Sequence, residues 1–105
     1  MSFDAEVIIV GAGPVGLVAG ARLASMGIDF LILESEAEPS DDLRASTFHP
    51  PTLEMLATLG FAEPLIARGL ISPTWQVRMH ETGEHALFDL SVLGEDTRYP
   101  FRLQC

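Results

Sequence analysis

The stretch from Val7 to Ser35, VIIVGAGPVGLVAGARLASMGIDFLILES, decides the fold of this chain. Two short apolar runs, Val7–Val10 and Phe30–Leu33, stand at either end of it, and the second run stops at an acid, Glu34. Short continuous apolar runs rich in β-branched residues are typical of strands buried on both faces of a parallel sheet. We therefore expect two such strands.

The segment between these runs predicts a helix. Pro14 suits the first helical position, the helix is expected to run to about Met26, and Gly27 suits a left-handed C-terminal cap. A strand, a helix and a second strand joined by a short crossover predict parallel strands with a right-handed connection. The sequence thus predicts a βαβ unit over about residues 5–35.

The glycines of GAGPVG follow the first predicted strand and begin the predicted helix. A glycine motif indicates a dinucleotide-binding loop only in this context. Gly11 permits a tight turn, Gly13 lets the backbone approach a pyrophosphate, and Gly16 lets the helix pack against the strand. The free amides and the positive dipole end of the helix then face the phosphates. The motif predicts a dinucleotide-binding loop.

Glu34 completes this predicted site at the end of the second strand. A carboxylate there accepts hydrogen bonds from both hydroxyls of an adenosine ribose and repels a 2′-phosphate, which favours FAD or NAD over NADP. The spacing of the motif does not distinguish FAD from NAD. An α/β turn without a ligand is the structural alternative.

The rest of the chain does not continue as a plain dehydrogenase half-domain, because no third parallel strand is evident. An irregular polar loop follows Glu34, and beyond Asp89 the chain is loop-like until Phe101–Cys105, which begins another element. Between these loops we expect two helices, Thr47–Gly60 and Ala62–Arg68, and a β-hairpin formed by Trp75–His80 and His85–Phe88.

Composition narrows the classes of function. The chain has 105 residues and a net charge of −9, from 15 acidic against 6 basic residues, which argues against binding to nucleic acid or to an anionic membrane. The single cysteine, Cys105, excludes an internal disulfide and predicts a reducing, cytoplasmic location. Asp4 and Glu6 precede the first apolar run where a signal peptide carries positive charge, so no signal peptide is predicted.

Other residue types give weaker predictions. The three histidines, His49, His80 and His85, lack a metal-ligand spacing, so no metal site is expected. Trp75 is expected in the core, and Arg102 either reaches a pyrophosphate or lies on the surface. The methionines expected to fill gaps in the core are Met26, Met55 and Met79.

Several segments together carry a family resemblance. GAGPVG with Glu34 is followed by LRAS at Leu43–Ser46, HPPTLEMLATLGFAEPLIARG at His49–Gly69 and YPFRLQ at Tyr99–Gln104. This series resembles the N-terminal part of the FAD-dependent aromatic monooxygenases of class A, the para-hydroxybenzoate hydroxylase type. The resemblance covers nearly the whole chain.

The resemblance implies a set of cofactor-binding residues and no catalytic residue. Within the glycine loop, Pro14 and Val15 would join Gly11, Gly13 and Gly16 at the pyrophosphate. Ser35 would lie beside the ribose-binding Glu34, although many relatives have arginine or lysine at that position. Arg44 matches an arginine near the flavin and its phosphates, and Gln104 matches a glutamine that contacts FAD.

The resemblance also implies a fold and an activity. The fold would be α/β, a Rossmann-like FAD-binding βαβ unit followed by helices and a β-hairpin, as an incomplete piece of a larger FAD/NAD(P)-binding fold. Residues 1–105 would form the N-terminal portion of an FAD-binding domain, with a helical and hairpin extension over about 47–90. Such enzymes use NADPH or NADH and O2 to hydroxylate an aromatic, phenol-like substrate.

Enzymes of this type are several times longer than 105 residues, so we expect this segment to be inactive alone. The alternative function is a non-catalytic dinucleotide-binding module for FAD or NAD. An NAD-dependent dehydrogenase half-domain is the least favoured reading. The oligomeric state is not predicted.

Overall fold

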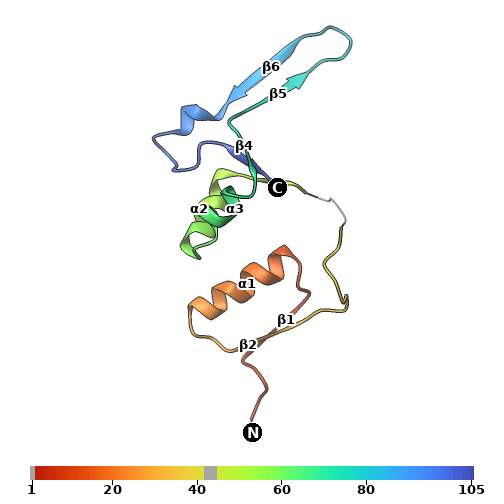
Figure 1. Ribbon diagram of the computed structural model, residues 1–105, viewed down its shortest axis with the longest axis vertical. Helices are drawn as coiled ribbons and strands as arrows, with labels where there is room; N and C mark the ends of the chain where they lie inside the picture. The colour runs from red at the N-terminus through yellow and green to blue at the C-terminus, as the bar shows by residue number, and fades with distance from the viewer. Residues whose placement is uncertain (1, 42–44) are drawn as a thin grey trace. The chain divides into compact units, whose positions relative to one another are not determined.

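The computed structural model describes residues 2–41 and 45–105, which belong to two compact units, residues 1–42 and 43–105. The first unit contains strand β1 (Val7–Val10), helix α1 (Pro14–Ser25) and strand β2 (Phe30–Leu33), shown in Figure 1. The strands pair in parallel, from Val7 opposite Phe30 to Val10 opposite Leu33. The predicted βαβ unit is therefore confirmed.

The ends of α1 follow from the residues that flank it. Gly13 is the extended N-cap residue and Pro14 occupies the first turn. At the other end, Gly27 has a φ of 71°, its N–H donates to the Ala24 carbonyl, and the N–H of Ile28 donates to that of Leu23. These two bonds form a Schellman motif, which the glycine permits because it lacks a Cβ atom.

The prediction that the first two strands are buried on both faces is wrong for the described chain. Burial alternates along β1 and β2, and Val10 is 85% exposed. The reason is that α1 packs on one face only, where Phe30 and Ile32 lie against Gly20. The other face exposes Ile8, Val10, Leu31 and Leu33.

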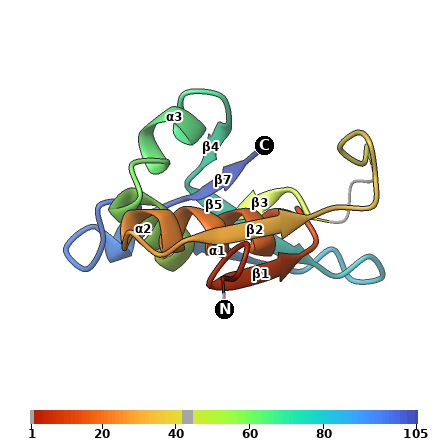
Figure 2. The same ribbon diagram turned by 90° about the horizontal axis from the view of Figure 1, so that it is seen from below.

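The second unit is built around a short antiparallel sheet. Its strands β3 (Thr47–Phe48), β4 (Leu70–Ser72) and β7 (Arg102–Gln104) have the order β3-β7-β4, with β7 between the other two (Figure 2). The same unit contains helices α2 (Pro50–Thr58) and α3 (Ala62–Ile66). The buried apolar residues of the unit are Leu53, Leu56, Ala62, Tyr99 and Leu103.

Two details of this unit differ from the sequence-based expectation. The helix expected from Thr47 begins at Pro50, because Thr47 and Phe48 pair with Gln104 and Leu103 as strand β3. Strand β4 was not predicted at all. Both strands are short, and their partner β7 is distant in the chain, so no local pattern reveals them.

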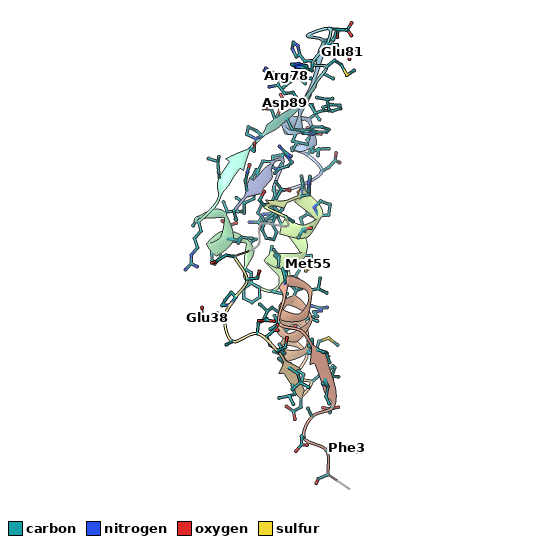
Figure 3. The ribbon with its side chains drawn as sticks, turned by 90° about the vertical axis from the view of Figure 1, so that its right-hand side faces the viewer. Phe3, Glu38, Met55, Arg78, Glu81 and Asp89 are labelled. Atoms are coloured by element: carbon teal, nitrogen blue, oxygen red, sulfur yellow. The ribbon has the colours of Figure 1, made fainter. Side chains whose placement is uncertain are left out.

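The expected hairpin is present as β5 (Thr74–Arg78) and β6 (His85–Asp89), followed by a 3-10 turn, η1 (Leu90–Leu93). In Figure 3, Arg78 and Asp89 lie on its two strands and Glu81 at its tip. Trp75 stacks on Phe88, with ring centroids 4.2 Å apart and an interplanar angle of 10°.

The expected core positions of Trp75 and of the three methionines are wrong. Trp75 is 37% exposed, and Met26, Met55 and Met79 are exposed as well. Both strands of the hairpin are exposed along their whole length, so Trp75 packs against its cross-strand neighbour rather than within a core.

Candidate functional site

The glycine loop between β1 and α1 adopts the geometry that its sequence predicts. Gly11 has a φ of 102°, a conformation that favours glycine, and its N–H donates to the Leu33 carbonyl at 2.7 Å. A Cβ atom on Gly16 would overlap the carbonyl oxygen of Gly11 and lie 3.3 Å from Cγ2 of Ile9. Gly16 is therefore required for the close approach of the helix to the loop.

Gly13 differs from both of these glycines. It is the N-cap residue of α1 with φ −73°, and no heavy atom lies within 4 Å of the position its Cβ would take. The absence of a side chain here is thus required neither by the backbone conformation nor by packing within the chain. It leaves open space at the helix N-terminus, where backbone amides point outward.

Glu34 is tied to this loop by direct hydrogen bonds. Its Oε2 atom accepts from the N–H of Ala12 at 2.7 Å, while Oε1 accepts from the N–H of Glu36 at 3.0 Å and from the Ser35 hydroxyl at 3.4 Å. The hydrogen bonds from the Glu36 and Ala12 amides, in that order, lower the pKa of this carboxyl group. The link to Ala12 was not foreseen, because no sequence pattern reports a backbone contact.

An open depression of about 370 Å³ lies where the two parallel strands end. Its lining residues are Val10, Gly11, Leu33, Glu34 and Ser35. In open α/β folds, ligands bind outside the carboxyl ends of the strands, so this depression is in the expected place. Val10 and Leu33, which the sequence predicts to be buried in a sheet, form apolar walls of this depression.

The structure therefore brings most of the expected cofactor-binding residues into one region. Pro14 begins α1, and Val15 beside it is exposed. Gln104 lies on β7 in the second unit and is exposed. Arg44 lies outside the described residues.

These features fit a dinucleotide. The amides at the start of the 12-residue helix α1 and the open space at Gly13 suit a pyrophosphate, and the carboxylate of Glu34 suits the hydroxyls of a ribose. Within residues 2–41 and 45–105, no group of three or more metal-ligating side chains could hold a metal ion. No helix in the described part of the chain is long and apolar enough to cross a membrane.

Comparison with known proteins places the chain among flavoprotein sequences. A family model described as an FAD binding domain matches residues 4–102. A 6-hydroxy-3-succinoylpyridine 3-monooxygenase of Pseudomonas putida is 42% identical over 103 residues, which cover 98% of this chain and 26% of that protein.

Solved structures give the same result. A p-nitrophenol 4-monooxygenase from Pseudomonas putida superimposes with a TM-score of 0.85 at 37% identity, covering 93% of this chain and 25% of the other. An aklavinone-11 hydroxylase, in a ternary complex with FAD and aklavinone, gives 0.76 at 26% identity and covers 98% and 22%. The chain thus spans about a quarter of the length of these relatives.

The hydrogen bonds of Glu34 predict a stability that falls at acid pH. Because its pKa is lowered in the folded chain, its contribution is fully present above the ordinary carboxyl pKa and is lost as the pH falls through the folded value. Glu34→Gln should lower the unfolding temperature near neutral pH, since the amide oxygen of glutamine can replace only one of the two acceptors that serve Ala12 and Glu36. The difference from the unaltered protein should shrink as the pH falls.

The matched control for this prediction is Glu38→Gln. Glu38 is an exposed acid of the same segment (Figure 3) and should leave the pH profile of the unfolding temperature unchanged. If the difference in unfolding temperature between Glu34→Gln and the unaltered protein stayed constant across the acid range, the carboxylate of Glu34 would not stabilise the loop.

Proposed function

Because the chain belongs to the FAD binding domain family, we propose that it is the FAD-binding segment of a flavin monooxygenase. The complete enzyme uses NADPH or NADH and O2 to hydroxylate an aromatic or phenol-like substrate. The observation that carries this proposal is the 42% identity to an aromatic-ring monooxygenase along 98% of the chain. We assign both compact units to the N-terminal portion of one FAD-binding domain, an assignment that the family match over residues 4–102 supports.

The residues of the first unit have separate roles in this proposal. Gly11 and Gly16 fix the turn, and Gly13 leaves room for the pyrophosphate at the N-terminus of α1. The carboxylate of Glu34 binds the ribose hydroxyls while Oε2 holds the loop amide of Ala12. When bound, FAD supplies the redox and oxygen chemistry, and the protein positions it and excludes water.

The other expected contacts remain part of the proposal. Pro14 and Val15 flank the pyrophosphate, and Ser35 lies beside the adenosine ribose. Arg44 neutralises phosphate charge with directional hydrogen bonds, as a guanidinium does. Gln104, exposed on β7, contacts the flavin.

The proposed substrate is a small aromatic compound with a ring hydroxyl. The two most similar proteins described above are named for a hydroxylated succinoylpyridine and for p-nitrophenol. The proposed location is the cytoplasm, in keeping with a single cysteine that is free.

A non-catalytic dinucleotide-binding module is the second candidate function. The observation that favours it is that the glycine loop and Glu34 form a site that suits NAD as well as FAD. The two candidates differ in whether the protein retains a flavin.

The deciding experiment uses the protein expressed from its complete reading frame. We expect a visible flavin spectrum, release of FAD on denaturation, and oxidation of NADPH or NADH that a phenolic probe such as p-nitrophenol stimulates. A folded but colourless protein that FAD does not reconstitute would overturn the monooxygenase proposal and favour the module.

A further inference from the structure

Arg102 in β7 has an unmet hydrogen-bonding group. Its Nε atom is buried and has no hydrogen-bond partner in the described part of the chain. Burying a donor without an acceptor costs free energy, and a native protein keeps such a group where something else meets the demand. Within the described residues, the Nε atom of Arg102 is thus a buried donor that lacks an acceptor.

The position of Arg102 in the sheet shows where that acceptor would come from. Side chains alternate along a strand, so Arg102 and Gln104 share one face of β7, opposite the buried Leu103. Ser72 is the cross-strand partner of Arg102, and Thr47 is that of Gln104, so both lie on the same face. This polar face of the sheet, formed by Thr47, Ser72, Arg102 and Gln104, faces away from the core.

The guanidinium of Arg102 lies near the aromatic pair of the hairpin. The Cζ atom of Arg102 lies 5.9 Å from the centre of the Trp75 ring, within the range of a cation–π interaction, and Trp75 is itself stacked on Phe88. The ring stabilises the positive charge but offers no oxygen acceptor to Nε. A guanidinium presents its donors in a rigid planar arrangement, which suits directional binding of an oxyanion.

We propose that Arg102 binds an anionic oxygen of a ligand at the polar face of the sheet, next to Gln104. The oxygen belongs either to the pyrophosphate of FAD or to a phenolate or carboxylate of the substrate. This inference rests on the proposed function and adds to it an anion-binding residue.

The test uses the complete protein and compares Arg102→Gln and Arg102→Lys with Arg98→Gln. Arg98 is the matched control, because its Cζ atom lies 5.8 Å from the Tyr99 ring centre but the residue is exposed. Two affinities are measured by titration: that of the apoprotein for FAD, with riboflavin as the phosphate-free comparison, and that of the FAD-loaded protein for p-nitrophenol. Unfolding temperatures are recorded in parallel.

If the oxygen comes from the cofactor, both Arg102 variants should weaken FAD binding about 10-fold or more and leave riboflavin binding unchanged. If the oxygen comes from the substrate, both Arg102 variants should bind FAD with unchanged affinity, and their affinity for p-nitrophenol should fall by a similar factor. Arg98→Gln should change neither.

Two results would overturn the proposal. One is unchanged affinity for FAD and for p-nitrophenol in both variants, with only a lower unfolding temperature. The other is failure of both Arg102 variants to fold, which would assign the side chain to the packing on Trp75. If the unaltered protein binds no FAD, the proposed function itself has failed, so the two failures are distinguishable.

Discussion

Replacing Gly16 by alanine is expected to destabilise the first unit strongly. The added Cβ would overlap the carbonyl oxygen of Gly11, a backbone atom in a turn that cannot shift without moving the whole loop. We expect a loss of about 3 kcal/mol or more in the free energy of unfolding, at the upper end of overpacking effects. Chemical denaturation of the protein, followed by circular dichroism, measures this loss.

Gly20→Ala is the matched control for this prediction. Gly20 lies in the same helix, and its Cβ would come within 2.9 Å of Cδ1 of Ile32 and Cε2 of Phe30, which are ends of side chains that can move. Alanine also gains about 1 kcal/mol over glycine within a helix, at both positions. Equal losses for the two variants would contradict the argument that the backbone contact at Gly16 is decisive.

Replacing Gly13 by alanine should separate ligand binding from folding. The backbone at Gly13 has a φ of −73°, which alanine adopts readily, and no atom lies within 4 Å of the new Cβ. The free energy of unfolding should therefore change by no more than about 0.5 kcal/mol. The methyl group would, however, stand in the space proposed for the pyrophosphate.

We therefore expect Gly13→Ala to lower the affinity for FAD about 10-fold or more, equivalent to about 1.4 kcal/mol. Titration of the apoprotein with FAD, followed by flavin fluorescence, measures this change. Gly20→Ala serves again as the control, because it should fold and retain its flavin. A Gly13→Ala protein that binds FAD with unaltered affinity would exclude Gly13 from the phosphate site.

Much of the candidate site could be read from the sequence because its elements are local. A strand, a turn with glycine at Gly11, a proline-initiated helix and an acid at the end of the next strand lie within 35 consecutive residues. Each element depends on neighbours in the chain, and the structure reproduces their order. The family resemblance uses this stretch together with three later segments, Leu43–Ser46, His49–Gly69 and Tyr99–Gln104, and it is confirmed by the match over residues 4–102.

Features that join distant residues could not be read in this way. The bond from the Ala12 amide to Glu34 spans 22 residues and uses a backbone donor that carries no sequence signal. Strand β3 escaped prediction because Thr47 and Phe48 become a strand only by pairing with Gln104 and Leu103. Trp75 was misplaced because hydrophobicity alone does not tell a core residue from one stacked on a cross-strand partner.

The sequence by itself determined the βαβ unit, the glycine loop and the acid that follows it, because the backbone conformation of a strand, a turn or a helix depends mainly on neighbouring residues. Only the tertiary structure shows the physical reason why the motif assigns packing to Gly16 and ligand approach to Gly13. That distinction depends on what surrounds each missing Cβ: a backbone oxygen at Gly16 and open space at Gly13. It likewise revealed the unmet Nε of Arg102, since burial and hydrogen bonding depend on every segment around a group.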